Sequence, residues 1–280
     1  MTNLNSSTDP LTSPANQQWQ WRNGVLTCEL LQDWQHGFFT RSHSPKLPDE
    51  LHEHLRKETA PMVGRAYRAK QIHSDRLLHT QEIETAISTN TSLPEADGVW
   101  ASPQADDHRL RRSVWVCTAD CVPVLIGDRH LGTVAAIHAG WRGTAAQILP
   151  KAIATLTNHG SKLPDLRIAL GPAISGQVYQ VSQEVAQQVT ATVNKPVGLY
   201  PDDHPERVKL DLRQVQAQQL QELGISPENI AIAPYCTLSH EDIFHSYRRY
   251  CLNEANPLPR APQVQWSGIA INSIAINSKL

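Results

Sequence analysis

Three short apolar runs in the middle of the chain constrain its fold more than any other feature. They cover residues 114–117, 122–126 and 133–137, and only short polar or glycine-containing segments separate them. Runs of this length that are rich in valine and isoleucine are typical of buried strands, because a helix usually needs about ten residues or more. We therefore predict that all three are central strands of a sheet.

Further strands are predicted on both sides of this block. Residues 19–40 indicate two short strands joined at Asn23-Gly24, a dipeptide that favours a tight hairpin turn. Bounded apolar runs indicate later strands, at 167–170, 230–233 and 268–276. The polar, proline-containing segment 89–112 is predicted to be a loop, and 42–60 a loop or a short exposed helix.

Helical patterns appear only after the strand block. Residues 144–159 predict a helix, with Pro150 as a point where it could break or kink. Two more helices are predicted together with residues suited to their N-caps, namely 182–193 with Ser182, and 211–223 with Asp211 and a capping-box Gln214.

Strands and helices therefore alternate without the regular rhythm of a parallel α/β fold. We predict an α+β fold in which one sheet packs on another and helices cover the outside. Residues 1–18 are polar and have the composition of a disordered tail, so a single domain over 19–280 is expected.

Composition excludes several classes of function. The chain has 25 basic and 27 acidic residues, a net charge of −2, which argues against a nucleic-acid or anionic membrane surface as partner. No apolar run approaches the roughly 18 residues of a membrane span, and the polar N-terminus does not resemble a signal peptide. Five scattered cysteines favour the reducing cytoplasm, with free or metal-bound thiols.

Three segments carry residues suited to a metal ion: QIHSDRL with His73, CTADCVPVLIGD with Cys121, and VAAIHAGWRGT with His138. Each residue lies at the edge of an apolar run. Zinc binds imidazole and thiolate, and catalytic zinc sites usually combine three protein ligands with one open position. A packed histidine or cysteine beside a strand gives the same pattern, so spacing alone leaves both readings open. Cys117, inside VWVC, is predicted to be a buried core thiol.

Other polar residues next to these segments suit a phosphorylated or anionic substrate. Small residues after His138 lead into a predicted helix, whose first N–H groups together with Arg142 would form an anion site. A plain turn with a surface arginine is the alternative. Asp120 is a candidate orienting residue, substrate acceptor or general acid/base, or an ordinary turn aspartate. Arg248-Arg249 is a second candidate anion contact.

Taken together the segments resemble the YfiH/YlmD-like family, formerly described as multicopper polyphenol oxidoreductases (laccases). The similar segments run in order from 36 to 250: HGFFTR, QIHSDRL, ADGVW, TADCVPVLIGD, HAGWRGT, LGPAISGQVYQV, LDL, CT and FHSYRRY. This resemblance implies an α/β/β/α layered fold and one zinc ion held by His73, Cys121 and His138. It also makes Arg41, Arg142 and Arg248 candidates for phosphate or substrate contacts.

Members of that family are similar in acting on purine nucleosides. The resemblance implies phosphorolysis of adenosine, inosine, guanosine and S-methyl-5′-thioadenosine to the base and the matching ribose 1-phosphate, and deamination of adenosine to inosine. The candidate catalytic residues are then Asp120 and the three metal ligands. The chain departs from the family pattern after FFTR, where a Gly-Gly-Val-Ser segment is missing, and after Tyr250, where Thr-Gly-Arg is missing. The first departure is expected to alter a substrate-facing loop, and the two together could give a substrate range, or an activity, different from that of typical members.

Three other functions are compatible with the same residues. Cys121 and His138 could form the nucleophile–base pair of a metal-independent cysteine hydrolase. A copper-dependent polyphenol oxidase would need several coppers and many histidines in His-x-His pairs, and the chain has one such pair, His52 and His54. A metal-stabilised binding module would have a fully coordinated, closed site. No pattern in the sequence specifies an oligomeric state or gives His245 a role beyond packing.

Overall fold

The apolar runs of the sequence form the central strands of two packed sheets. The computed structural model describes residues 18–52, 64–103, 111–252 and 263–271. In these residues the first sheet has the order β1-β2-β3-β15-β7-β4 and the second β14-β10-β8-β9-β6-β5, six strands each. The first contains β1 (Trp19–Arg22), β2 (Val25–Cys28), β3 (His36–Phe38), β15 (Gln265–Ala270), β7 (Arg111–Thr118) and β4 (Gly64–Tyr67).

The second sheet contains the other two central runs. Its strands are β14 (Ile230–Ile232), β10 (Leu166–Leu170), β8 (Val122–Asp128), β9 (Val134–Ala139), β6 (Gly98–Ala101) and β5 (Leu77–His79). The small sheet β11-β13-β12 lies beside it, with β11 (Gln180–Ser182), β13 (Arg207–Leu210) and β12 (Leu199–Tyr200). The α-helices in the described part of the chain are α2 (Pro48–Leu51), α3 (Thr80–Ser88), α4 (Trp141–Ala145), α5 (Ile148–Asn158), α6 (Gln183–Thr190), α7 (Leu212–Glu222) and α8 (Tyr247–Leu252).

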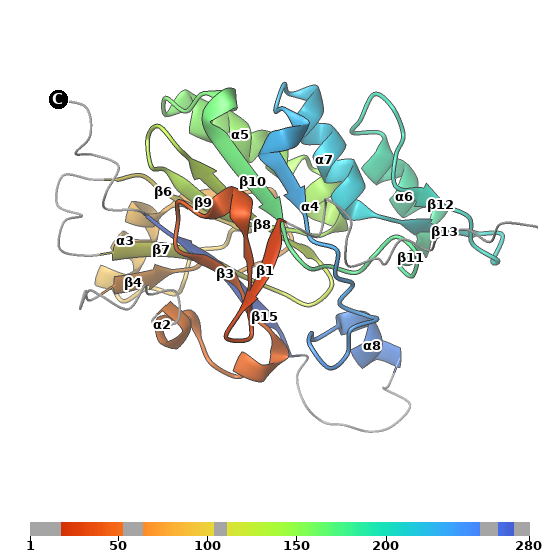
Figure 1. The fold of residues 1–280 in the computed structure, drawn as a ribbon, viewed down its shortest axis with the longest axis horizontal. Helices are drawn as coiled ribbons and strands as arrows, with labels where there is room; N and C mark the ends of the chain where they lie inside the picture. The colour runs from red at the N-terminus through yellow and green to blue at the C-terminus, as the bar shows by residue number, and fades with distance from the viewer. Residues whose placement is uncertain (1–17, 53–63, 104–110, 253–262, 272–280) are drawn as a thin grey trace, which may run out of the picture.

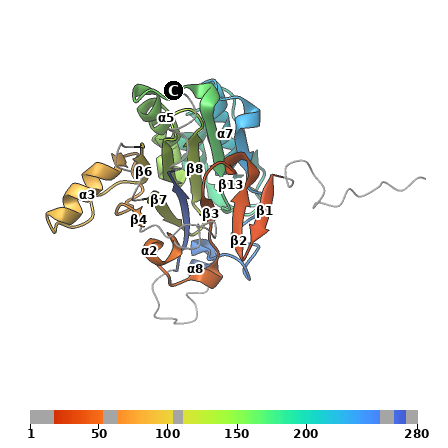
Figure 2. The same ribbon diagram turned by 60° about the vertical axis from the view of Figure 1, so that its left-hand side comes forward.

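Strand alternation divides the buried side chains into separate cores. On β9, Val134 and Ala136 pack between the two sheets, whereas Ala135 and Ile137 pack against α5 and α7. A third cluster joins Trp115 of the first sheet to Leu51 of α2 on that sheet's outer face. The layers are therefore helix, sheet, sheet and helix, with α5 and α7 above the second sheet in Figure 1 and α3 projecting from its edge in Figure 2. The predicted α+β layered fold is confirmed.

The structure confirms the predicted hairpin turn and the two predicted helix N-caps. Asn23 and Gly24 both have positive φ, 51° and 76°, as the tight turn between β1 and β2 requires. The side chains of Ser182 and Asp211 accept hydrogen bonds from the first turns of α6 and α7. Gln214 does not complete a capping box, because the Asp211 amide donates to the Gly198 carbonyl at 2.7 Å; the Gln214 side-chain amide donates to the Tyr200 hydroxyl instead.

The helix predicted over 144–159 is instead two helices, α4 and α5. The break falls at Gln147, which has φ 60°, and not at Pro150. Pro150 is the third residue of α5, where its missing N–H leaves no helical hydrogen bond unmade. The prediction of a loop over 89–112 is wrong at two places in the described residues. The segment contains the whole of β6 and the first two residues of β7. The four residues of β6 are all buried and pair with β9.

Some predictions lie partly or wholly outside the described residues. These are the tail at 1–17, the segment 53–60, the loop residues 104–110 and the end of the last predicted strand at 272–276. The observed strand there is β15, which begins earlier than predicted. No helix in the described part of the chain has the length and apolar character needed to cross a bilayer. The domain boundary at residue 18 stays a prediction.

His36 makes stability depend on pH. Its Nε2 accepts from the Cys28 amide at 2.8 Å and its Nδ1 donates to the Trp34 carbonyl at 3.0 Å, so the neutral ring is fully bonded. Burial lowers the pKa of His36 from 6.5 to about 4. Above pH 6.5 the ring is neutral in both folded and unfolded chains. Between 6.5 and 4 only the unfolded chain binds the proton, so the free energy of unfolding falls by roughly 3 kcal/mol.

Urea unfolding followed from neutral pH to about pH 4 measures this loss. His36→Gln is expected to be less stable than the natural chain at neutral pH and to lose less stability on acidification. An identical pH slope in the variant would assign the loss to other groups, among them His245, whose pKa burial also lowers to about 4.

Candidate metal centre and its pocket

Pairing of β8 with β9 brings Cys121 and His138 together. Val122 is paired with Ala139, so Cys121 and His138 lie at the same end of two neighbouring strands. His138 has the strand parity of Val134 and Ala136, which face the first sheet, and it is 3% exposed. Cys121 is partly buried. The two side chains therefore lie where the core between the sheets ends.

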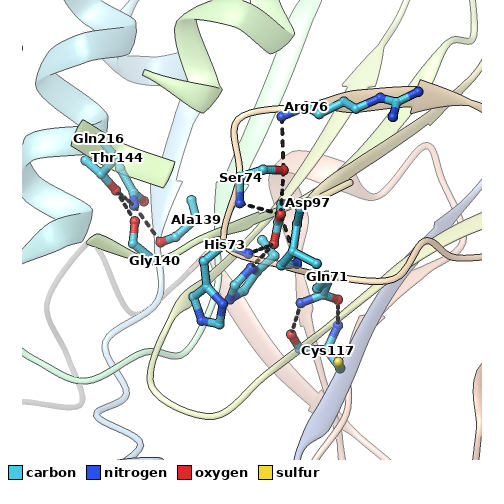
Figure 3. Close-up of polar contacts among 12 residues, drawn as sticks. Gln71, His73, Ser74, Arg76, Asp97, Cys117, Ala139, Gly140, Thr144 and Gln216 are labelled. Atoms are coloured by element: carbon cyan, nitrogen blue, oxygen red, sulfur yellow. Dashed lines mark hydrogen bonds and ion pairs between the residues drawn. The ribbon is translucent and has the colours of Figure 1, made fainter. Parts of the chain in front are cut away.

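His73 reaches the same place from a loop between β4 and β5. It has φ 62°, in the left-handed region that a histidine adopts rarely. Its amide donates to Asp97 Oδ1 at 2.9 Å, and the Ser74 amide donates to Asp97 Oδ2 at 2.6 Å. Figure 3 shows His73 and Ser74 turned around the Asp97 carboxylate. Asp97 thus fixes the loop that carries His73.

The same carboxylate also orients His138. Asp97 immediately precedes β6, which pairs with β9, and its carbonyl accepts from the His138 amide at 2.7 Å. Its Oδ1 lies 2.8 Å from His138 Nδ1, and because a carboxylate cannot donate, Nδ1 carries the proton. The Nε2 lone pair of His138 is then available on the other side of the ring. Burial raises the pKa of Asp97, but bonds from His138 and Ser74 outweigh it and hold the pKa at about 2.

The three predicted ligands form one cluster. Ligand atoms of His73, Cys121 and His138 all lie within 4.8 Å of one another, the only such group of potential ligands among the described residues. The His73 and His138 rings are 4.8 Å apart and nearly perpendicular. Two imidazole nitrogens and one thiolate sulfur suit zinc and other borderline metal ions. The donor set and its spacing therefore fit a metal ion.

Charge on the cluster favours a bound cation. Burial raises the pKa of the Cys121 thiol, but the charge of His138 and hydrogen bonding to His138 and His73 outweigh it, so the net shift is downward. Burial lowers the pKa of His138, but Cys121 and Asp97 reverse this, and the net shift is upward. Both shifts favour the thiolate and the imidazolium when no metal is bound, and a metal ion would take the place of the proton on His138 Nε2.

Gly140 leaves the space that the thiolate needs. A Cβ at this position would lie 2.7 Å from Cys121 Sγ. We expect Gly140→Ala to weaken binding of zinc, as a probe metal, by roughly 10- to 100-fold, because changes beside a metal ligand have effects of that size. Competition with a chromophoric chelator measures the dissociation constant. Gly143→Ala is the matched control, since its Cβ would meet the Ile148 side chain at 3.3 Å and not the thiol. Equal weakening in both variants would contradict the steric argument.

A pocket of about 260 Å³ opens beside the cluster. His73 and Cys121 form part of its wall, and His138 lies behind them. Five of the pocket's other ten lining residues are aromatic or cationic. The ten come from the turn between β7 and β8, from α4, from the segment between β10 and β11, and from α7 and α8: Ala119, Asp120, Trp141, Arg142, Ile174, Tyr179, Leu212, Tyr247, Arg248 and Cys251. Its volume and its mixture of rings and guanidinium groups suit a small aromatic molecule with an anionic partner.

Arg142 and Arg248 both face this pocket, as predicted candidates should. The Arg142 guanidinium lies 4.3 Å from the Trp141 ring, and it forms no ion pair with the described carboxylates. Arg248 stacks over Tyr179 at 5.5 Å and donates to the Gln180 carbonyl at 3.0 Å. The helix after His138 has only five residues, so positive charge at this end of the pocket comes mainly from the arginines.

Arg41 lies elsewhere. It is exposed, does not line the pocket, and donates to the Glu241 carbonyl. Its role as a substrate contact stays a prediction. Nearby His245 is buried, and no described group bonds its Nε2.

Asp120 accepts three hydrogen bonds from two other segments of the chain. Its Oδ1 accepts from the Thr237 hydroxyl at 2.6 Å, and its Oδ2 accepts from the Ser246 hydroxyl at 2.9 Å and the Arg248 amide at 2.7 Å. These bonds tie the start of α8 to the pocket wall. A carboxylate with both oxygens occupied is better suited to positioning Arg248 than to transferring protons.

Sequence reasoning missed Asp97 and the aromatic lining. Asp97 belongs to the segment ADGVW, whose resemblance to the family was noted without a role for the aspartate. Tyr179 and Tyr247 lie in LGPAISGQVYQV and FHSYRRY, and only the fold brings them together. Cys117 is half-buried and lies outside the metal cluster. Its backbone amide donates to the Gln71 side-chain oxygen, and its carbonyl accepts from the Gln71 side-chain amide.

Comparisons with known proteins agree with this arrangement. Residues 48–255 match the family model described as multi-copper polyphenol oxidoreductase laccase. A purine nucleoside phosphorylase of Synechocystis is 43% identical over 276 residues, covering 90% of this chain and 96% of that protein.

Two solved structures share the fold. YlmD from Geobacillus stearothermophilus matches with a TM-score of 0.74 and 23% identity, and YfiH from Bacillus licheniformis with 0.70 and 22%. Each match covers 91% of this chain and 99% of the solved chain. The family model and the cyanobacterial relative both span most of the sequence, and the fold agrees. The chain therefore belongs to the YfiH-like family, the one whose model is described as multi-copper polyphenol oxidoreductase laccase.

Proposed function

We propose that this protein is a zinc-dependent purine nucleoside phosphorylase. The observation that carries the proposal is the position of the His73–Cys121–His138 cluster in the wall of a pocket that Arg142 and Arg248 also line. A similar protein from Synechocystis is named a purine nucleoside phosphorylase. The proposed substrates are adenosine, inosine, guanosine and S-methyl-5′-thioadenosine, with phosphate as the second substrate.

Zinc suits the cluster better than a set of coppers. The described residues provide one group of three potential ligands, whereas a multicopper oxidase needs several metal sites. The sequence has one His-x-His pair, His52 and His54. The His52 ring is hydrogen-bonded to the buried Ser113 hydroxyl, and His54 lies outside the described residues. A single copper could still occupy the cluster, because affinities of such sites rise towards copper. Metal analysis of the purified protein decides between the two.

In phosphorolysis a phosphate oxygen forms a bond to C1′ of the ribose while the bond from C1′ to the base breaks. The bonding electrons leave with the base, which then takes up a proton. Arg142 and Arg248 line the pocket, and in this proposal they bind and orient the phosphate by charge-assisted hydrogen bonds. Tyr179, Tyr247 and Trp141 provide ring surfaces for the purine and exclude water. Bound zinc would act as a Lewis acid that stabilises developing negative charge.

Deamination of adenosine to inosine is a second part of the proposal, and it needs a group that carries protons to the leaving ammonia. Asp120 lines the pocket, but its oxygens already accept three hydrogen bonds. We therefore propose phosphorolysis as the main reaction. Asp120→Asn should alter the pH profile of inosine formation if Asp120 takes part directly, and should lower all activities equally if it only positions Arg248.

A metal-independent cysteine hydrolase is the alternative that the geometry also favours. Cys121, His138 and Asp97 form the order of nucleophile, base and orienting carboxylate found in such enzymes. The convergence of His73 on the same sulfur argues for a metal, since a nucleophile–base pair has no need of a second imidazole. A hydrolase of this kind would survive chelation and lose its activity on alkylation.

The proposal is tested by incubating the protein with each of the four nucleosides, with and without phosphate, and separating nucleosides from free bases. We expect release of adenine, hypoxanthine or guanine only when phosphate is present, with inosine from adenosine as a minor product. The five cysteines all have free thiols, so the assay is run under reducing conditions. Free thiols also fit the cytoplasm, which we propose as the location of the protein. Base release at an equal rate without phosphate would instead indicate a hydrolase.

A further inference from the structure

One buried carboxylate accepts five hydrogen bonds beside the metal cluster. Asp97 is 1% exposed. Its Oδ2 accepts from the Ile72 amide at 3.2 Å, the Ser74 amide at 2.6 Å and the Ser74 hydroxyl at 2.7 Å. Its Oδ1 accepts from the His73 amide at 2.9 Å and from His138 Nδ1 at 2.8 Å. Two of the three candidate ligands are thus bonded to the same oxygen.

We infer that Asp97 is the positioning residue of the metal centre: one carboxylate sets the backbone of His73 and the ring of His138 together, before any metal binds. The inference rests on the proposed metal site. It assigns the pre-organisation of both imidazoles to a residue that is neither a candidate ligand nor a lining residue of the pocket. Loss of Asp97 would therefore release two ligands at once.

The backbone at His73 shows why this support is needed. A left-handed conformation is strained for a non-glycine residue such as His73, and an unsupported loop would relax from it. Three consecutive amides, from Ile72 to Ser74, converge on Asp97 and hold the turn. The Ser74 hydroxyl also accepts from the Arg76 amide at 3.3 Å, which extends the network along the loop in Figure 3.

An asparagine at position 97 could not replace this carboxylate. Its amide has one acceptor oxygen, and its NH₂ group would face N–H donors that need an acceptor. Cys121, in contrast, is positioned by pairing of β8 with β9 and has no hydrogen bond to Asp97. The inference therefore predicts damage to the two histidines with the thiol left in place.

Asp128 offers a matched control for the loss of a buried carboxylate. It is 0% exposed, ends β8 of the same sheet, and its Oδ1 accepts from the His130 and Leu131 amides, each at 2.8 Å. Like Asp97 it holds a turn, but it contacts none of the candidate ligands. Asp128→Asn thus reproduces the general cost of the substitution without the specific effect.

The test measures zinc affinity by chelator competition, and amide hydrogen exchange in the metal-free protein, for the natural chain and both variants. We expect the dissociation constant of zinc to rise roughly 10- to 100-fold in Asp97→Asn and to stay unchanged in Asp128→Asn. Amides 72–74 should exchange faster in metal-free Asp97→Asn by about tenfold or more, because their acceptor is lost. Accessibility of the Cys121 thiol to alkylation should rise only after zinc removal, in both variants and the natural chain alike.

Equal zinc affinity and equal exchange in Asp97→Asn and the natural chain would overturn the inference, as would equal weakening in both variants. If Asp97→Asn does not fold, Ser74→Ala removes one of the five bonds and is expected to weaken zinc binding roughly threefold; no change there would also overturn it. Zinc binding that depends on Asp97, in a protein that releases no base from nucleosides, would refute the proposed function while supporting the inference.

Discussion

Cys121→Ser is expected to abolish zinc retention and to lower phosphorolysis by on the order of 10³-fold or more, because a Lewis acid contributes several kcal/mol and each 1.4 kcal/mol is a factor of ten. Serine keeps the size of the side chain, but its hydroxyl is a poor zinc ligand at neutral pH. The partly buried position of Cys121 at the end of β8 should keep the fold intact. Zinc content by mass spectrometry and initial rates of base release measure the two effects.

Cys117→Ser is the matched control, because Cys117 lies four residues earlier, on β7 of the first sheet. Burial raises the pKa of its thiol to about 11, and its side chain lies outside the cluster, so no change in zinc content is expected. Cys121→Ser protein that keeps its zinc would contradict the ligand assignment. If the natural protein contains no zinc and Cys121→Ser still abolishes its activity, Cys121 would instead be identified as the nucleophile of the alternative hydrolase.

Arg248→Gln and Arg142→Gln form the second large prediction. Each removes a guanidinium that faces the pocket, and a hydrogen bond to a charged group contributes about 1.5–3 kcal/mol. We expect the KM for phosphate to rise roughly 10- to 100-fold in each variant, with a much smaller change in the KM for the nucleoside. Initial rates over a range of phosphate concentrations, at saturating nucleoside, measure this effect.

Two further variants separate a local contact from the loss of one positive charge. Arg65 is exposed on β4 and pairs with Glu84, so Arg65→Gln should leave the KM for phosphate unchanged. Arg41→Gln tests the one predicted arginine that lies outside the pocket. An equal rise of KM in Arg65→Gln would contradict a phosphate site between Arg142 and Arg248. A selective rise in the nucleoside KM would place these arginines at the nucleoside instead.

The sequence predicted those parts of the fold in which local chemistry determines the structure. Asn23-Gly24 forms the expected turn because its residues tolerate positive φ, and Ser182 caps α6 as its side chain allows. The break at Gln147 could not be predicted, because no glycine or proline marks it. The strand β6 was missed because only four residues, GVWA, interrupt a polar segment, and pairing with β9 supplies its stability.

The candidate site was predictable as a set of residue types but not as a network. His73, Cys121 and His138 stand out as residue types that suit a metal ion, each predicted at the edge of an apolar run, and the structure brings their ligand atoms together. Asp97 gives no such signal, since an aspartate before a short strand is common in turns. Its importance arises from β6 lying beside β9, a long-range pairing that no local pattern encodes. Asp120 shows the reverse case, a polar residue in a conspicuous motif whose oxygens bond Thr237, Ser246 and Arg248.

The central claim, that a zinc ion at this cluster and phosphate act together on a purine nucleoside, is tested most directly by ³¹P NMR. Protein purified without a metal-affinity tag is incubated with adenosine and inorganic phosphate, then with a chelator, and then with added zinc. We expect one zinc per chain and formation of ribose 1-phosphate in step with adenine, lost on chelation and restored by zinc. Adenine release without ribose 1-phosphate, or turnover that survives complete removal of the metal, would contradict it.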